Sequence, residues 1–119
     1  PYQGPLRNEL LAAAALAGVE VLDGGCVGVF QGPRLESAAE VRKARQDGCD
    51  MAGMTSLPEA GLARELGLDY AGIAVISNWG AGVTGERISE EHIAETLQEP
   101  MARVRKIVSA LIGRIAKEH

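Results

Sequence analysis

Residues 32–68 read GPRLESAAEVRKARQDGCDMAGMTSLPEAGLARELGL, and this stretch decides the fold. Ser37 to Asp47 has a helical composition and stops before a glycine, a residue that readily ends helices. Cys49 to Thr55 is a short stretch rich in small residues, which predicts a buried strand. Pro58 suits the first turn of a further helix. Helix, strand and helix in succession predict an α/β fold, in which functional residues gather where strands end.

The residues on the N-terminal side of this stretch predict a helix and then a hairpin. Pro5 to Ala17 has a helical composition, with a proline in the first turn and a glycine after the end. Val19 to Leu22 is a short strand candidate, and the apolar run Cys26 to Phe30 follows it after Asp-Gly-Gly. Because these turn residues leave only a tight connection, we expect the two runs to pair as a hairpin.

The residues on the C-terminal side predict one more strand and two helices. Tyr70 to Ile76 is apolar without alternation, which is typical of a strand covered on both faces. Ser89 is followed by acidic residues and predicts the N-cap of a helix. Pro100 is expected to divide this region into a short helix and a long one. The apolar stripe of the long helix predicts core packing.

The composition excludes several classes of function. The chain has 119 residues, of which 46% are apolar and 24% charged, as in an ordinary globular domain. The net charge of −4 and the scattered basic residues argue against nucleic acid or an anionic membrane as the main partner. No apolar run approaches the roughly 20 residues that span a bilayer. Cys26 and Cys49 lack metal-ligand spacing and are too few for a disulfide framework, which predicts reduced thiols in a cytoplasmic protein.

Polar residues at the ends of two predicted strands are candidates for binding a ligand. Thr55 and Ser56 lead into a helix, where hydroxyls and free backbone N–H groups make a natural anion site. Both residue types are also common helix caps that bind nothing. Ser77 and Asn78 end the most apolar strand before a glycine-rich loop and could face a ligand. The alternative is an ordinary loop in which the asparagine bonds its own backbone.

A third polar segment precedes the helix that starts near Ser37. Arg34 and Glu36 lie there, two residues apart, and by themselves they could form a solvated ion pair. Together with the two strand ends, this segment supports a different interpretation.

Together these segments resemble the trimeric purine nucleoside phosphorylase and methylthioadenosine phosphorylase family. The similarity is colinear from about Pro1 to Ile93. Its most specific parts are Gly32-Pro33-x-x-Glu36 and Gly53-Met54-Thr55-x-x-Pro58-Glu59, followed by the Ser77-Asn78 pair. The resemblance implies the C-terminal portion of a phosphorylase-type three-layer α/β/α fold with a mixed central sheet. Residues 1–119 are then the C-terminal part of a single domain.

The resemblance also implies a role for each motif residue. Met54 contacts the ribose, with its backbone N–H near a sugar hydroxyl, and Thr55 offers a hydroxyl to phosphate. The candidate catalytic residues are Glu36, which faces the Watson–Crick edge of the purine, and Asn78, which faces O6 and N7. Further substrate contacts fall on Ser77 beside the base, on Leu35 where relatives often have an aromatic residue, and on the region of Ile93.

The chemistry of phosphorolysis explains these residue types. Negative charge flows into the departing purine, and the Asn78 amide can donate to O6 or N7 as this charge develops. An ionised Glu36 accepts from N1–H, which a 6-oxopurine has and adenine lacks. An aspartate at position 78 would suit the amino group of adenine. The sequence therefore favours hypoxanthine or guanine nucleosides, including 5′-methylthioinosine.

The sugar's 5′ substituent is sensed, by resemblance, near the helix that begins around Ser89. Ile88 and Ile93 are apolar there and would suit a methylthio group, whereas Glu90 and His92 are polar and would suit a free hydroxyl. His92 is also explained as a surface residue of the helix. The similarity over the whole segment is greatest to methylthioinosine-type phosphorylases.

Members of this family are roughly twice the length of this chain. Their first half carries a glycine-rich phosphate loop, an arginine and a histidine that hold phosphate. We therefore expect the isolated chain to be inactive and to need the N-terminal half of the subunit. The resemblance further implies a homotrimer, with inorganic phosphate as co-substrate and no other cofactor or metal.

Three other functions remain open on the sequence. A hydrolytic nucleosidase would use water in place of phosphate, although its motifs match less well. A non-catalytic half-domain would keep only its affinity for purines. A structural α/β domain or assembly subunit would bind no purine at all.

Overall fold

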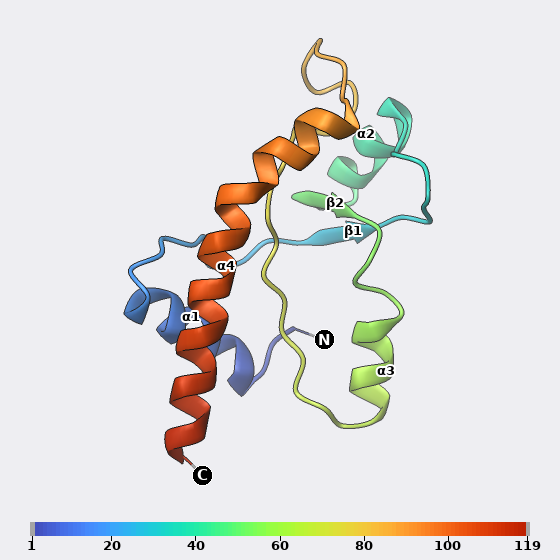
Figure 1. Ribbon diagram of the computed structural model, residues 1–119. Coiled ribbons are helices and arrows are strands. Elements are labelled where there is room, and N and C mark those ends of the chain that lie inside the picture. The colour runs from blue at the N-terminus through green and yellow to red at the C-terminus, as the bar shows by residue number, and fades with distance from the viewer. Residues whose placement is uncertain (1, 119) are drawn as a thin grey trace.

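The computed structural model describes residues 2–118, which fold into helices around a small parallel sheet. Figure 1 shows the order of the elements. In chain order they are α1 (Pro5–Leu16), β1 (Val27–Val29), α2 (Ala38–Gln46), β2 (Met51–Gly53), α3 (Glu59–Glu65) and α4 (Glu90–Glu118). The alternation of strands and helices confirms the predicted α/β class.

The centre of the fold is a βαβ unit made of β1, α2 and β2. Its two strands are parallel, with Val27 opposite Met51 and Val29 opposite Gly53. The Phe30 N–H extends this pairing by donating to the Gly53 carbonyl over 2.8 Å. Because the strands are parallel, their carboxyl ends lie at the same edge of the sheet. The motif segments that follow β1 and β2 in the sequence therefore begin at this edge.

The predicted hairpin of Val19 to Leu22 with Cys26 to Phe30 is wrong. The first run forms no strand, and β1 pairs with β2 instead. Val19 packs against the cluster between α1 and α4, whereas Leu22 is 93% exposed. The chain crosses through α2 and returns beside β1 as β2. The partner of β1 is therefore not Val19 to Leu22, the run that directly precedes it in the sequence.

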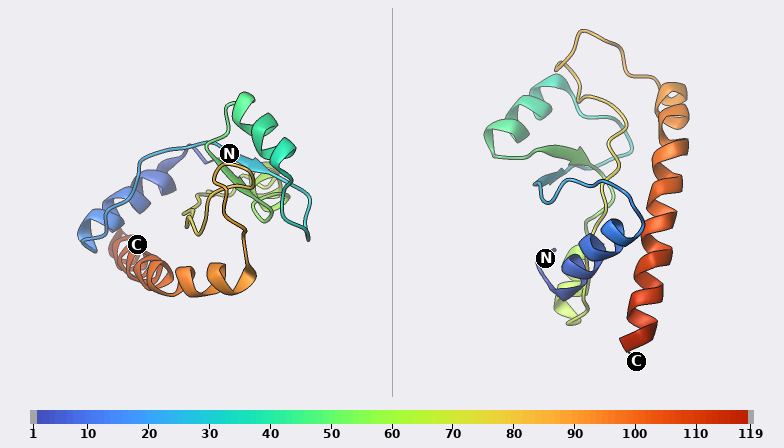
Figure 2. Two further views of the ribbon diagram at one scale, coloured as in Figure 1. Left: turned by 90° about the horizontal axis from the view of Figure 1, so that it is seen from above. Right: turned by 90° about the vertical axis from the view of Figure 1, so that its left-hand side faces the viewer.

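A small core joins α1 to α4. Ala13, Ala14 and Ile107 are buried together. Partly buried apolar residues surround them: Leu10, Val19, Ile73, Ala110 and Leu111. Glu9 of α1 accepts from the Arg114 guanidinium of α4 over 2.9 Å. Figure 2 shows α4 along one side of the molecule and the βαβ unit on the other.

The C-terminal half departs from two predictions. Tyr70 to Ile76 is extended but forms no strand, because among the described residues its backbone bonds to no other backbone. Pro100 does not divide the last region, since α4 is one helix from Glu90 to Glu118. Figure 1 shows this helix changing direction in its orange part. Within residues 2–118 no helix is both long and apolar enough to traverse a bilayer.

Candidate functional site

The ends of β1 and β2 bring two of the sequence motifs side by side. The loop that contains Gly32 leaves β1, and Met54 follows directly on β2. A Cβ atom placed on Gly32 would lie only 2.8 Å from the Met54 sulfur. Glycine at this position therefore allows the loop to lie directly against the methionine side chain. The segments expected to contact base and sugar are neighbours in the structure.

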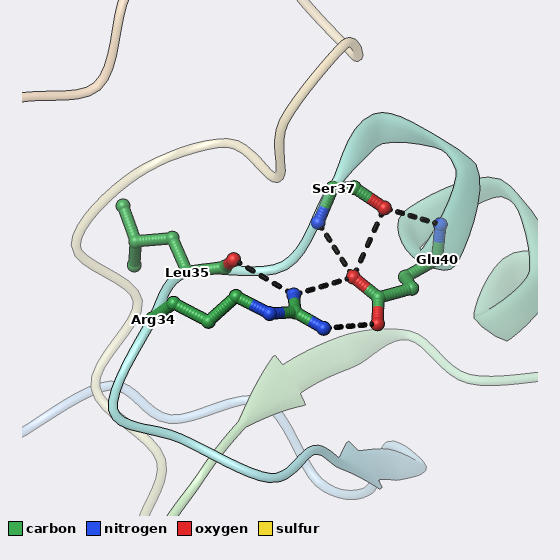
Figure 3. A network of polar contacts seen from close by, with 4 residues as sticks. All are labelled: Arg34, Leu35, Ser37 and Glu40. Atoms are coloured by element: carbon green, nitrogen blue, oxygen red, sulfur yellow. Dashed lines mark hydrogen bonds and ion pairs between the residues drawn. The ribbon is translucent and has the colours of Figure 1, made fainter.

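Arg34 does not pair with Glu36, so the solvated pair suggested by their spacing is wrong. Its guanidinium instead forms two hydrogen bonds with Glu40, Nη1 to Oε2 and Nη2 to Oε1, both over 2.7 Å. Figure 3 shows this ion pair at the start of α2. Glu36 is half-buried, and among residues 2–118 its carboxylate has no hydrogen bond or ion pair. A carboxylate placed in this way is available to a ligand.

Glu40 also completes the N-terminal cap of α2. Its Oε2 accepts from the Ser37 backbone N–H over 2.8 Å, and the Ser37 Oγ in turn accepts from the Glu40 N–H over 3.3 Å. The hydrogen bond from Arg34, followed by those from Ser37, lowers the pKa of Glu40 from 4.5 to about 2. Because this pKa is lowered on folding, the carboxylate's stabilising effect is complete above pH 4.5 and is lost as the pH falls toward 2.

The turn between β2 and α3 holds Thr55 and Ser56, and neither residue caps the helix. Pro58 occupies the N-cap position of α3, and no side chain bonds to the first turn. The capping alternative is therefore wrong. The anion site at the start of α3 stays a prediction, and the helix begins after Thr55 and Ser56 as expected. The Ser56 hydroxyl is buried without a hydrogen-bond partner among the described residues, while Thr55 is exposed. The hydroxyl of Thr55 stays a candidate phosphate contact on the resemblance alone.

Asn78 is held by its two neighbours. Its Oδ1 accepts from the Ser77 hydroxyl over 2.6 Å, and its Nδ2 donates to the Trp79 carbonyl over 2.8 Å. The self-bonding alternative thus holds for part of the amide. An asparagine amide has two N–H groups, so one donor remains after the bond to Trp79. The side chain is oriented by the loop and retains a donor for a ligand.

The Asn78 loop lies against the beginning of α2. A Cβ atom on Gly80 would lie 3.0 Å from the Val41 Cγ1, and one on Gly82 would lie 2.6 Å from the Ala38 Cβ. Ala38 follows Ser37 and is two residues from Glu36. The loop that carries Asn78 is therefore anchored on the helix that begins beside Glu36.

Replacement of Gly82 by alanine tests this anchoring. Gly82 has a φ of +75°, which disfavours any side chain, and the new methyl group would overlap Ala38. We expect Gly82→Ala to lower the free energy of unfolding by about 1–3 kcal/mol. Urea unfolding followed by circular dichroism measures the loss. Gly85→Ala is the control, because nothing lies within 4 Å of its Cβ position. Equal stability of the two variants would contradict the proposed contact.

The remaining predicted residues are less closely tied to this arrangement. Leu35 is 43% exposed on the β1–α2 loop. Ile93 is half-buried near the start of α4, and none of the contacts above includes it. Sequence reasoning missed Glu40, although Ser37 and Glu40 have the Ser-x-x-Glu spacing of a capping box. Gly82 and its contact with Ala38 could not be found in this way, because the contact arises from packing between distant segments.

Two further features of the chain bear on thiol chemistry and on metal binding. Cys26 and Cys49 are free thiols, and burial, followed by interaction with Cys26, raises the pKa of the Cys49 thiol. Within the described part of the chain, no cluster of three or more His, Cys, Asp or Glu side chains could hold a metal ion.

The chain is similar to known proteins of one family. A family model described as the phosphorylase superfamily matches residues 1–113. The chain is 44% identical over 119 residues to a probable S-methyl-5′-thioinosine phosphorylase of Xylella fastidiosa, covering 99% of this chain and 46% of that protein. It is 38% identical over 118 residues to the 6-oxopurine nucleoside phosphorylase of Pyrococcus furiosus, covering 99% of this chain and 44% of that one.

A solved structure has the same fold. It is the methylthioadenosine phosphorylase from Schistosoma mansoni in complex with adenine, with a TM-score of 0.88 and 25% sequence identity, covering 98% of this chain and 46% of that chain. The chain thus spans less than half the length of these relatives. The likeness confirms the phosphorylase-type fold that the motifs imply. Since the family model extends over nearly all of the sequence and the architecture agrees with that of a solved relative, the chain belongs to the phosphorylase superfamily.

Proposed function

We propose that this chain is the nucleoside-binding part of an enzyme that cleaves a purine nucleoside with phosphate. The products are the free base and ribose 1-phosphate or its methylthio derivative. The observation that carries the proposal is the convergence of three motifs, Gly32 to Glu36 beside Met54 and the Asn78 loop on the start of α2. The names of the relatives from Xylella fastidiosa and Pyrococcus furiosus support a 6-oxopurine nucleoside, including 5′-methylthioinosine.

In this proposal each residue has a separate task. Glu36 accepts from the N1–H of the base, and the free N–H of Asn78 donates to O6 or N7. Met54 lies against the ribose, Thr55 binds phosphate, and Ser77 orients Asn78. Leu35 and Ile93 supply apolar surface to the base and to the 5′ substituent.

The remaining parts of the proposal concern the whole enzyme. Residues 1–119 are the C-terminal part of a single domain that is completed by an N-terminal half, and three subunits assemble into a trimer. Phosphate is the co-substrate, and the reaction uses no other cofactor. We place the enzyme in the cytoplasm, which is supported by the two free thiols.

The proposal predicts that the isolated chain releases no hypoxanthine from inosine or 5′-methylthioinosine, with or without phosphate. The native protein from its source is expected to release hypoxanthine only when phosphate is present. Chromatography of the products measures both reactions, and the intact mass of the native protein is compared with 12.5 kDa. Robust turnover by the isolated chain would contradict the need for an N-terminal half.

The same assay separates the alternatives. Hypoxanthine release that does not depend on phosphate would indicate a hydrolytic nucleosidase. Purine binding in a calorimeter without turnover by the native protein would indicate a non-catalytic module, and absence of binding a structural domain. The names of the relatives favour the phosphorylase.

A further inference from the structure

The peptide groups before and after Glu36 each form a hydrogen bond with one member of the Arg34–Glu40 ion pair. On its N-terminal side, the Leu35 carbonyl accepts from Arg34 Nη1 over 3.1 Å. On its C-terminal side, the Ser37 N–H donates to Glu40 Oε2 over 2.8 Å. Arg34 and Glu40 are themselves joined by two hydrogen bonds. Figure 3 shows the resulting network of Arg34, Leu35, Ser37 and Glu40. None of its hydrogen bonds involves the Glu36 carboxylate.

This geometry fixes the direction in which the Glu36 side chain leaves the backbone. The Leu35 carbonyl belongs to the peptide group before the Glu36 Cα, and the Ser37 N–H belongs to the peptide group after it. When both planes are held, rotation about the two bonds of that Cα is restricted. A planar guanidinium with two parallel bonds to a carboxylate is well suited to hold such a geometry.

We infer that Arg34 and Glu40 are positioning residues that aim the Glu36 carboxylate at the purine base. The inference rests on the proposed function, in which Glu36 accepts from N1–H. The effect of Arg34 and Glu40 reaches the substrate only through Glu36.

The test is a double-mutant cycle in the active enzyme that contains this chain. Glu40→Gln is expected to lower kcat/KM for inosine about tenfold, because a misplaced binding group loses much of its effect. In a Glu36→Ala background the same change is expected to alter kcat/KM less than about twofold, since the side chain that it positions is absent. Purine riboside has no N1–H, and its kcat/KM should stay within about twofold of the wild-type value in Glu40→Gln.

Two further variants make the test specific. Arg34→Gln leaves the Ser37–Glu40 cap in place and removes the bond to the Leu35 carbonyl, so it should reproduce Glu40→Gln even if the latter folds poorly. Lys43→Gln breaks the ion pair of Lys43 with Asp47 on the same helix and should leave kcat/KM unchanged. A fall that is equally large in the Glu36→Ala background, or for purine riboside, would overturn the inference and indicate a merely structural role.

Failure of the proposed function gives a different result. A wild-type enzyme without phosphate-dependent release of base contradicts that function. The affinity for hypoxanthine is then measured by calorimetry for the same variants. Glu40→Gln is again expected to weaken binding only when Glu36 is present. A protein that binds no hypoxanthine overturns both proposals.

Discussion

Asn78→Asp is expected to change the ratio of kcat/KM between inosine and adenosine by at least about a hundredfold, in favour of adenosine. Asn78 has one N–H left after its bond to the Trp79 carbonyl. In the proposed reaction this donor stabilises the negative charge on the departing 6-oxopurine. An aspartate loses the donor and gains an acceptor, which suits the 6-amino group of adenine. The expected loss for inosine alone is about 10²- to 10³-fold, mainly in kcat.

The local geometry adds a second consequence. Nδ2 of Asn78 lies 2.8 Å from the Trp79 carbonyl oxygen. A carboxylate oxygen in that place would face another acceptor, so the side chain must rotate or take up a proton. The Ser77 hydroxyl can still donate to the other oxygen. We therefore expect Asn78→Asp to be less stable than the wild type, as well as altered in its preference.

Asn78→Ala is the control that separates these effects. It removes the donor without adding an acceptor, so both nucleosides should react more slowly and adenosine should gain nothing. Initial rates with inosine and adenosine at saturating phosphate give the ratio for each variant. If Asn78→Asp lowers stability while the ratio stays unchanged, Asn78 is only a loop residue that bonds its own backbone, and the base assignment fails.

Elements whose signals lie in their own stretch of sequence were predicted well, and features that depend on distant segments were not. The α2 helix was predicted almost to the residue, because its composition is helical and a glycine follows its end. The hairpin was wrong because the choice of partner for β1 is not local. Asp-Gly-Gly describes a turn, but it does not say that the chain will cross through α2 and return beside β1 as β2.

Two errors in the C-terminal half have the same origin. The apolar pattern of Tyr70 to Ile76 predicts burial, yet a strand also needs a hydrogen-bonding neighbour, which the described residues do not give it. Pro100 costs α4 one backbone hydrogen bond, but the helix continues. Ile107 and the residues around it pack against α1, and this burial stabilises the helix beyond the proline.

The sequence indicated the motif residues of the candidate site, which stay a prediction, but not the contacts that support them. The spacing of Glu36, Met54 and Asn78 pointed to a family, and the strand ends indeed place the first two segments together. The choice of Glu40 rather than Glu36 as the partner of Arg34 was not foreseen. Both carboxylates are near in sequence, but only Glu40 lies one helical turn beyond Ser37, where it can cap the helix and bind the guanidinium together.

The second large effect is expected for Glu36→Ala, which should lower kcat/KM for inosine about a hundredfold. The reason is the loss of a charge-assisted hydrogen bond from the N1–H of the base. The effect should fall mainly on KM. Since the purine becomes more negative as it departs, a carboxylate at N1–H gains no strength in the transition state, and the bond contributes to binding rather than to the chemical step.

Purine riboside is the control substrate, and Glu65→Ala is the control variant. Purine riboside offers a lone pair at N1, so removal of the carboxylate should leave its kcat/KM unchanged or raise it. Glu65 is an exposed carboxylate at the end of α3, and its loss should affect neither substrate. Steady-state rates of Glu36→Ala and Glu65→Ala, each with inosine and with purine riboside, test this prediction. An equal fall for both substrates in Glu36→Ala would mean that Glu36 stabilises the loop and does not read the base, because only inosine carries the proton that the carboxylate accepts.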